Sequence, residues 1–275
     1  MMQITQIDYL HEVGAKKKQE DYLWPVPGRA SSRDKVFIVC DGVGGLESGE
    51  VASKIVAEYV GKELLKIPPS EVELPLINGL LEAARLKLVE YATLKSLSTD
   101  MATTFTLLQL VNDRAFIAWC GDSRVYHLRK NKILFRTEDH SLVDSLFRKG
   151  VLTEEEARSH PQRNLLLKAV RADELLPEAD GHWIGDIRED DHFLLCTDGL
   201  LENISDADLL FLLHQHELGE KDLGKALGQF CLDRTWDNYS MYLIRVSPMR
   251  TVMKAGMSKA RRGIRRLRTW LRGGG

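Results

Sequence analysis

The sequence predicts a layered α+β domain in which antiparallel strands form the centre and helices cover the outside. Strand-like apolar runs follow one another closely through the middle of the chain, with two-residue turn signals between them, as in hairpins. Two long segments with apolar residues three and four positions apart predict helices before these strands. Further helical segments follow the strands.

In the first hundred residues, expected strands and helices alternate. Residues 4–13 alternate loosely between apolar and polar side chains and predict an edge strand, whereas 36–40 is a continuous apolar run typical of a buried strand. Glycines after Asp41 indicate a tight turn, and apolar residues at helical spacing predict a helix over 51–64. A proline pair ends this helix, and a second one is expected at about 74–97.

Strands dominate the middle of the chain, and strands and helices mix after it. The expected strands cover 104–111, 115–120, 124–128, 132–135, 192–196 and 239–246. The expected helices cover 141–150, 153–159, 206–214 and 221–232. Thr153, followed three residues later by Glu156, fits a capping box at the start of one of these helices.

Composition and cysteine usage are those of a cytosolic globular protein. Hydrophobic residues make up 44% of the chain and charged residues 28%. The first ten residues lack the apolar core of a secretory signal, and no run approaches the roughly 18 apolar residues that cross a bilayer. No Cys-x-x-Cys pair is present, so reduced core cysteines are expected rather than a disulfide or zinc site. They are Cys40, Cys120, Cys196 and Cys231.

A basic C-terminal tail follows an acidic body. Nine of the 38 Lys and Arg, but none of the 40 Asp and Glu, lie in 250–275, which leaves 1–249 with a formal balance of −11. We therefore expect a folded domain at 1–248 and a tail at 249–275. Apolar residues in the tail alternate at spacings of four and three, as on an amphipathic helix that binds an anionic membrane surface or an acidic partner. A frayed, soluble tail is equally compatible, because two glycines weaken the helix.

Four short acidic motifs stand where strands are expected to end. They are Glu20-Asp21, Asp41-Gly42-Val43-Gly44-Gly45, Thr197-Asp198-Gly199 and Asp237-Asn238. Taken singly, each fits a turn or a solvated loop. Asp41 and Asp198, however, follow apolar runs that should be buried, so their carboxylates begin near the core. Carboxylates that converge without basic partners repel one another, and the usual counter-charge is a hard divalent cation, Mg²⁺ or Mn²⁺. The sequence therefore predicts a metal-dependent hydrolase.

The order of these motifs resembles that of the metal-dependent PPM protein serine/threonine phosphatases, the protein phosphatase 2C-like family. Further matching segments are Met101-Ala102-Thr103-Thr104, Gly121-Asp122-Ser123-Arg124 and Asp139-His140-Ser141. His160-Pro161 and Arg163-Asn164 are similar to the bacterial pattern of the family. The resemblance covers about residues 4–246. It implies a four-layer α-β-β-α sandwich, in which two antiparallel β-sheets are flanked by helix pairs.

The resemblance also implies a centre of two Mn²⁺ or Mg²⁺ ions and a third, more weakly held ion. Asp41 would bridge the first two ions, with the Gly42 carbonyl and Glu20 on one of them. Asp198 and Asp237 would hold the other ion, Asp21 would orient metal-bound water, and Asp122 would help to hold the third ion. The catalytic residues so implied are Asp21, Asp41, Asp198 and Asp237. The implied metal-site residues are Glu20, Asp21, Asp41, Gly42, Asp122, Asp198 and Asp237.

Four positions near the motifs need separate interpretation. Lys16 stands where the family often has a phosphate-gripping arginine, and lysine offers a point charge in place of a bidentate fork. Val43 stands where some eukaryotic relatives carry a histidine proposed as general acid. His140 could be a general acid, but a structural hydrogen bond is the preferred interpretation. Trp236 is expected to be a packing residue.

The resemblance implies hydrolysis of phosphoserine and phosphothreonine in proteins by a hydroxide that bridges the metals, in opposition to a serine/threonine kinase in bacterial signalling. The expected partners are phosphorylated proteins and that kinase, without nucleic acid. The chain is expected to be a cytoplasmic monomer, with the tail as its contact to the inner membrane face or an acidic partner. Two alternatives remain open: a non-catalytic phosphoprotein-binding module and a phosphatase of small phosphate esters.

Overall fold

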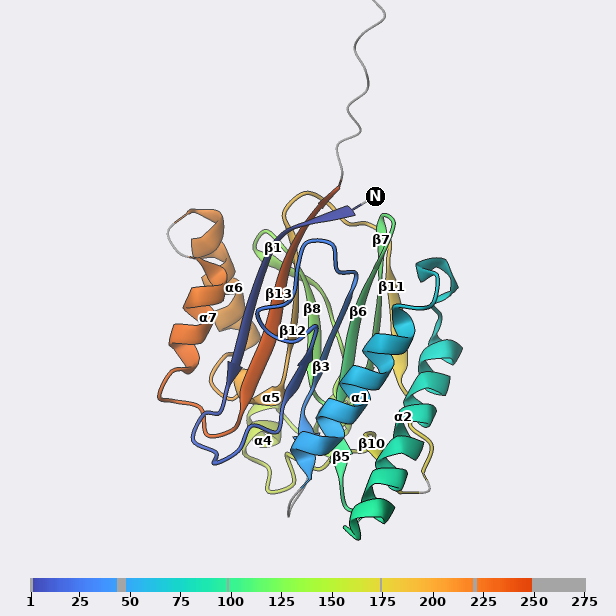
Figure 1. The fold of residues 1–275 in the computed structure, drawn as a ribbon. Helices are drawn as coiled ribbons and strands as arrows, with labels where there is room; N and C mark the ends of the chain where they lie inside the picture. Colours follow the sequence, from blue (N-terminus) through green and yellow to red (C-terminus); the bar gives the residue numbers. More distant parts are fainter. Residues whose placement is uncertain (1, 44–47, 98, 174, 220–221, 249–275) are drawn as a thin grey trace, which may run out of the picture.

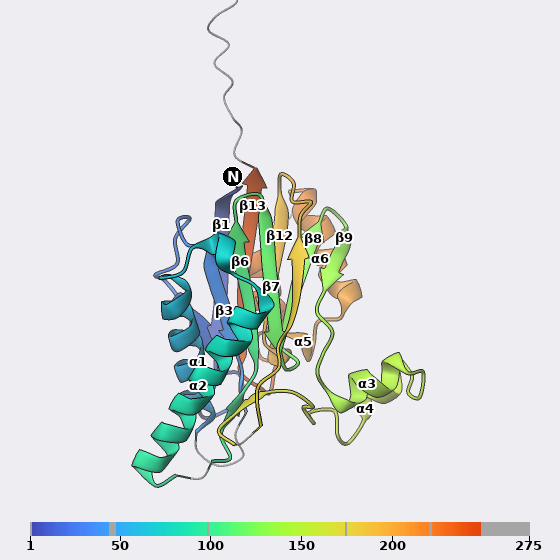
Figure 2. The same ribbon diagram turned by 90° about the vertical axis from the view of Figure 1, so that its right-hand side faces the viewer.

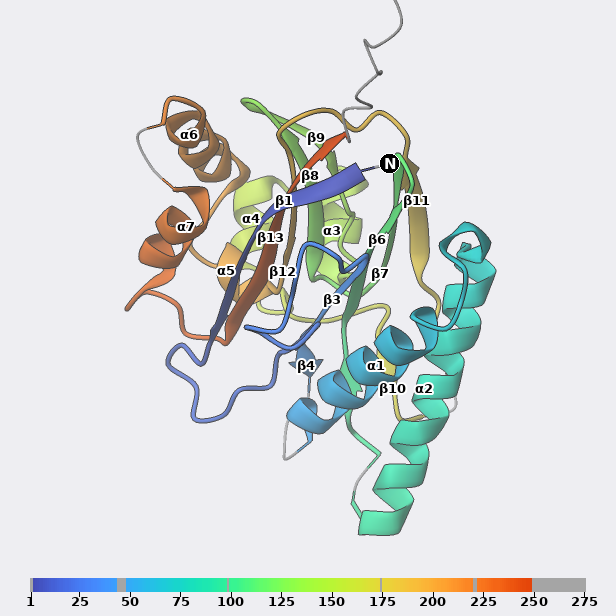
Figure 3. The ribbon, with the colours of Figure 1, turned by 45° about the horizontal axis from the view of Figure 1, so that its top comes forward.

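Two five-stranded antiparallel sheets stack face to face, and a pair of helices covers the outer face of each (Figures 1 and 3). The computed structural model describes residues 2–43, 48–97, 99–173, 175–219 and 222–248. The first sheet has the order β1 (Met2–Glu12), β13 (Tyr239–Pro248), β12 (Asp191–Cys196), β8 (Arg124–Arg129), β9 (Lys132–Arg136). The second has the order β11 (Asp180–Ile184), β7 (Arg114–Cys120), β6 (Phe105–Val111), β3 (Val36–Cys40), β2 (Tyr22–Trp24). The expected α-β-β-α sandwich is confirmed.

The helices complete the outer layers. A short 3-10 turn (Pro69–Glu71) joins α1 (Gly49–Leu64) to α2 (Leu74–Lys95), and this pair covers the second sheet. On the first sheet lie α6 (Asp206–Glu217) and α7 (Leu223–Cys231). Figure 2 shows α3 (Leu142–Arg148) and α4 (Glu154–Ser159) standing away from both sheets. The capping box of Thr153 and Glu156 at the start of α4 is confirmed.

The apolar strands are continuous because both faces of each sheet are covered. In β3, Phe37 and Val39 lie in the core between the sheets, whereas Val36, Ile38 and Cys40 lie in the core under α1 and α2. The same alternation divides β12 between the central core and the core under α6 and α7. Each large side chain buried in this way contributes roughly 1.5–3 kcal/mol. These strands therefore end in loops whose positions are fixed by two packed layers.

A small third sheet lies beside one end of the sandwich. It has the order β10 (Val170–Arg171), β5 (Ala102–Thr103), β4 (Gly42–Val43), and it pairs Gly42 with Thr103. The one-turn helix α5 (Asp198–Leu201) begins directly after β12 at the same end, which is the lower end in Figure 1. Loops from both large sheets thus meet at this end.

Most of the expected elements are confirmed, with two omissions among the strands of the two large sheets. The loosely alternating first segment is the edge strand β1, paired only with β13 among the described strands. All four cysteines are buried and free, as expected. The strands β2 and β11 were not expected: β2 has three residues, and β11 has no clear alternation between buried and exposed side chains. The predicted amphipathic helix at 249–275 lies outside the described residues.

Among the helices that the structure describes, none combines the length and the hydropathy needed to cross a membrane.

Candidate metal centre

The predicted acidic residues come from four segments of the chain that meet at one end of the sandwich, the lower end in Figure 1. Asp41 follows the last residue of β3, and Asp198 begins α5 after β12. Asp237 precedes β13, and Glu20 and Asp21 lie in the loop between β1 and β2. Because β13 runs antiparallel to β1 and β12, its start lies beside the end of both. The topology therefore brings together residues that are up to 217 positions apart in the sequence.

The backbone of Asp41 is held by the segment 101–104. The Asp41 N–H donates to Thr104 Oγ1 at 2.9 Å, and the Thr104 N–H donates to the Asp41 carbonyl at 2.9 Å. The Thr103 hydroxyl also donates to that carbonyl, at 2.8 Å. Thr104 Oγ1 in turn lies 2.7 Å from the hydroxyl of Ser123, the residue after Asp122. Thr103, Thr104 and Ser123 therefore have a structural role, which is to position the backbone of Asp41.

Asn238 ties the Glu20 loop to the start of β13. Its Oδ1 accepts the Glu20 N–H at 2.7 Å, and its Nδ2 donates to the carbonyls of Val13 and Lys18, each at 2.8 Å. The Glu20 carbonyl accepts the Ser53 hydroxyl at 2.5 Å and the Gly42 N–H at 3.1 Å. Asn238 is 2% exposed, so it serves as a buried scaffold for the ligand loops.

Two glycines allow these loops to approach closely. A Cβ on Gly199 would lie 2.0 Å from the Asn238 carbonyl oxygen, and one on Gly14 would lie 2.0 Å from that of Asp237. Gly14 also has a φ of +63°, which favours glycine. Any side chain at either position would push the start of β13 away from its neighbours. Gly14 lies in a loop without a recognisable motif, and its role was not predicted.

Burial and mutual repulsion act on the carboxylates together. Asp21 is 3% exposed, and this burial is the main cause that raises its pKa to about 7. The charges of Asp198 and Asp237 raise it further, whereas hydrogen bonds from Ser240 and Thr197 act in the opposite direction. Burial is also the main cause that raises the pKa of Asp41, Asp122 and Asp198. The charges of Asp21, Asp198 and Asp122 add to the effect on Asp41. The ionised cluster is therefore unfavourable without a positive charge.

Two carboxylate oxygens in the cluster indicate where a cation would bind. Asp21 Oδ1 and Asp198 Oδ1 are buried and have no hydrogen-bond partner, whereas Asp21 Oδ2 accepts the Thr197 hydroxyl at 3.0 Å. Carboxylate oxygens left in this state fit hard divalent cations such as Mg²⁺ or Mn²⁺. In the described part of the chain, no three carboxylate, imidazole or thiol groups are already arranged as a ligand group for one ion. The chemistry of these side chains and their closeness thus fit a divalent metal centre. Their present arrangement does not form a complete coordination shell.

Lys16, which was expected at the phosphate-binding position, lies inside the acidic cluster. Its Nζ is 2.9 Å from Asp237 Oδ1 and 4.0 Å from Glu20 Oε2. Burial alone would lower the pKa of Lys16, but the hydrogen bond and charge of Asp237 and the charges of Glu20 and Asp41 raise it. Lys18 instead contacts Glu50 at 3.5 Å. Lys16 therefore neutralises part of the acidic cluster.

His140 joins the Asp122 loop to Asp180, the first residue of β11. The Gly121 N–H donates to His140 Nδ1 at 3.2 Å, so Nδ1 is the acceptor and Nε2 carries the proton that it shares with Asp180 Oδ2 at 3.1 Å. Burial is the first cause that lowers the pKa of this imidazole. The structural interpretation of His140 agrees with these contacts.

The expectation that Trp236 packs is wrong. Its side chain is 77% exposed, although it directly precedes Asp237. Ser53 and Glu50 of α1 were not predicted for the site either. Ser53 binds the Glu20 carbonyl, and Glu50 Oε2 is buried without a hydrogen-bond partner. Their roles depend on how α1 packs against the Glu20 loop, and no local pattern in the sequence carries that information.

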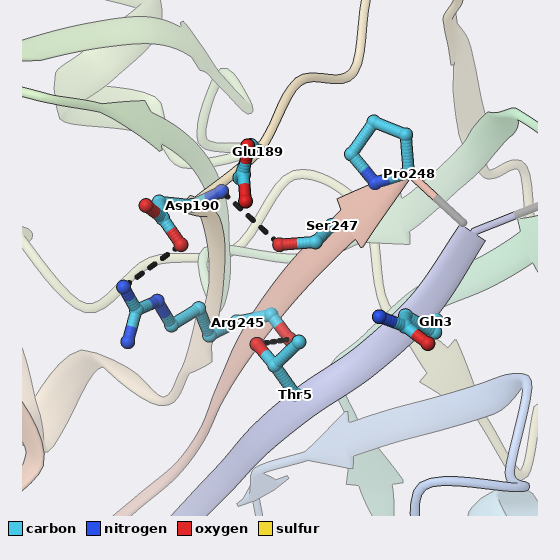
Figure 4. Close-up of a pocket in the computed structure, with 7 residues that line it drawn as sticks. All are labelled: Gln3, Thr5, Glu189, Asp190, Arg245, Ser247 and Pro248. Atoms are coloured by element: carbon cyan, nitrogen blue, oxygen red, sulfur yellow. Dashed lines mark hydrogen bonds and ion pairs between the residues drawn. The ribbon is translucent and has the colours of Figure 1, made fainter. Parts of the chain in front are cut away.

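A surface hollow of about 490 Å³ lies at the opposite end of the sandwich (Figure 4). It is lined by Gln3, Thr5, Glu189, Asp190, Arg245, Ser247 and Pro248. Arg245 pairs with Asp190 at 2.8 Å across it. None of the predicted site residues lines this hollow, so the candidate centre rests on the chemistry of its donors and not on the shape of a cavity.

The sequence of the chain is similar to those of known protein phosphatases. A family model described as Protein phosphatase 2C matches residues 16–228. Serine/threonine protein phosphatase PstP of Mycobacterium tuberculosis is 31% identical over 198 residues, which cover 70% of this chain but 38% of that protein. Serine/threonine phosphatase stp of Listeria innocua is 31% identical over 200 residues, 70% of this chain and 79% of that protein.

Solved structures agree with the sequence matches. The crystal structure of the mycobacterial serine/threonine phosphatase PstP superposes with a TM-score of 0.75 at 26% identity, over 90% of this chain and 100% of that one. The catalytic domain of PstP in complex with two manganese ions gives a TM-score of 0.73 at 25% identity, with the same coverage.

Proposed function

The chain belongs to the protein phosphatase 2C family, and we propose that it hydrolyses phosphoserine and phosphothreonine in proteins with the help of two divalent cations. The observation that carries the proposal is the pair of buried, unpartnered carboxylate oxygens on Asp21 and Asp198, within a set of carboxylates whose pKa values are raised by burial first and by neighbouring negative charges second. A relative that binds two manganese ions supports the same interpretation.

The carboxylates would divide between two ions. Asp41 would contact both, the Gly42 carbonyl and Glu20 would complete one site, and Asp198 and Asp237 would complete the other. When bound, the cations would neutralise the phosphate dianion and make a water nucleophilic near neutral pH. Mg²⁺ and Mn²⁺ both suit this oxygen-rich donor set.

The remaining polar residues would act on the water and the phosphate. Asp21, with one oxygen fixed by the Thr197 hydroxyl, would orient the attacking water with the other. Lys16 would exchange its contact with Asp237 for one with a phosphate oxygen, because its side chain is 43% exposed and its Nζ already lies at the centre. Asp122, beside the Thr104–Ser123 contact, would hold a third ion more weakly.

The cellular role follows from the substrate. A phosphatase of phosphoserine and phosphothreonine opposes a serine/threonine kinase, and we propose this role in bacterial signalling, in the cytoplasm and as a monomer. The basic segment 249–275 would bring the enzyme to an anionic membrane surface or an acidic partner. No nucleic-acid substrate is proposed.

The test is hydrolysis of a phosphothreonine peptide by the full chain in EDTA, Mg²⁺ or Mn²⁺, with Asp198→Asn as the inactive variant. We expect turnover that requires the cation and that the substitution abolishes. Free phosphoserine as a competing substrate distinguishes a protein phosphatase from a phosphatase of small esters. Tight Mn²⁺ binding by calorimetry without turnover of any phosphopeptide would instead indicate the non-catalytic alternative.

A further inference from the structure

Trp236 is an exposed aromatic residue at the edge of the candidate metal centre. Its side chain is 77% exposed, whereas that of Trp119, for example, is 7% exposed. It directly precedes Asp237, which contacts Lys16 at 2.9 Å. Among the described residues, no aromatic ring or cation stacks on its indole. A nearby cation, the Arg234 guanidinium, lies instead over the Phe230 ring, 5.5 Å from its centroid.

The loop that carries Trp236 is held in place by hydrogen bonds. The Trp236 N–H donates to Glu202 Oε2 at 2.9 Å. Asn203 Nδ2 donates to the Arg234 carbonyl and to Thr235 Oγ1, each at 3.2 Å. Thr235 is 5% exposed, and its hydroxyl donates to the Cys231 carbonyl at 3.2 Å. The exposed indole therefore stands on an anchored backbone, which reduces the entropy lost when it contacts a ligand.

Carboxylates lie beside Trp236 in the sequence and at its backbone N–H. Glu202 receives the Trp236 N–H and is close enough to Asp198 for its charge to help raise the pKa of that carboxyl. Asp233 lies three residues before Trp236 and is exposed, and Asp237 follows it. An exposed indole with carboxylates next to it along the chain suits a cationic side chain, because cation–π attraction and ion pairing act in the same direction.

We propose that Trp236 and Glu202 recognise a basic side chain, arginine above all, that flanks the phosphorylated serine or threonine of the substrate. This inference rests on the proposed function and specifies its substrate class. Arginine suits the site because its planar guanidinium stacks on the indole while its N–H groups reach a carboxylate. The phosphate would lie at the carboxylate cluster, and the flanking residue would lie over the loop between α7 and β13.

The test compares phosphothreonine peptides that differ only in one flanking residue, arginine or glutamate, scanned over the positions on both sides. The full chain is assayed with Mn²⁺ as wild type, Trp236→Ala, Trp236→Phe and Glu202→Gln. The control variant is Phe211→Ala, which removes a 59% exposed aromatic side chain from α6, on the outer layer of the sandwich.

At one or more positions, we expect the wild type to prefer the arginine peptide by about five- to tenfold in kcat/KM, mainly through KM. Trp236→Ala should reduce this ratio to about twofold or less, Trp236→Phe should keep much of it, and Phe211→Ala should leave it unchanged. A wild type that hydrolyses both peptides equally, or a Trp236→Ala variant with an unchanged ratio, would overturn the inference and leave the proposed function intact. Failure of the wild type on every peptide would count against the proposed function itself.

Discussion

Replacing Asp21 by asparagine should stabilise the metal-free protein at pH 8. The pKa of Asp21 is raised from an ordinary 3.8 to about 7. Below pH 3.8 both the folded and the unfolded states are protonated, so the folded state carries no penalty. As the pH rises from 3.8 to 7, the unfolded state ionises first and the folded state loses stability. At about 1.4 kcal/mol per pKa unit, the full loss above pH 7 is about 4 kcal/mol.

Asparagine remains neutral at every pH and can still accept the Thr197 hydroxyl bond through Oδ1. Its amide N–H groups need new partners in a buried place, which costs about 1–3 kcal/mol. The net gain at pH 8 is therefore about 2 kcal/mol, equivalent to a Tm increase of roughly 4–8 °C for a domain of this size.

The assay is thermal unfolding in EDTA between pH 4 and 8.5, followed by circular dichroism. The control is Asp113→Asn, at an exposed turn position between β6 and β7. The Tm advantage of Asp21→Asn should grow with pH and should vanish or reverse near pH 4, whereas the control should show no such trend. Saturating Mn²⁺ should reverse the order of wild type and Asp21→Asn at pH 8. An Asp21→Asn variant that is less stable than wild type in EDTA at pH 8, or a pH-independent difference, would refute the reasoning.

Three further changes test other parts of the centre. Asn238→Ala removes the three hydrogen bonds of a buried side chain. The free energy of unfolding, measured by urea titration, should fall by about 3 kcal/mol, and a fall below about 1 kcal/mol would contradict the scaffold role of Asn238. Gly199→Ala places a Cβ 2.0 Å from the Asn238 carbonyl oxygen. The Mn²⁺ affinity, measured by calorimetry, should therefore fall at least about tenfold. An unchanged affinity would show that the close approach of Gly199 to Asn238 is unimportant. Lys16→Met frees Asp237 from its ion pair and should tighten Mn²⁺ binding about fivefold. The same change should raise the KM for a phosphopeptide. Weaker Mn²⁺ binding would show that Lys16 does not compete with the cations.

The sequence predicts the layered fold well because its long strands and helices carry strong periodic patterns. The strand β3 is apolar at every position and is buried between two layers, and α1 has the helical spacing that its buried face requires. The edge strands β2 and β11 are too short or too irregular for such a pattern. Pairing with β3 and β7 forms them, and pairing is a property of the assembled sheet.

At the centre, the motifs identify the residues, and their surroundings come from the tertiary structure. Asp41 and Asp198 could be predicted because each follows a buried strand. The contact of Lys16 with Asp237 could not, because it joins two loops that are distant in sequence. Trp236 was misassigned for a related reason: an aromatic residue usually packs, and only the fold shows that this loop turns its indole outward.

The last strand that the structure describes, β13, lies between β1 and β12, and Asp237 and Asn238 directly precede it. During synthesis, the Glu20 loop, Asp41 and Asp198 all leave the ribosome before this strand does. Until it inserts, β1 has no partner among the described strands, and the loops that Asn238 would join remain separate. A nascent chain that stops short of β13 should therefore have no complete centre, however much of the rest has folded. The order of residues along the chain thus delays the assembly of the candidate centre until the sandwich is finished.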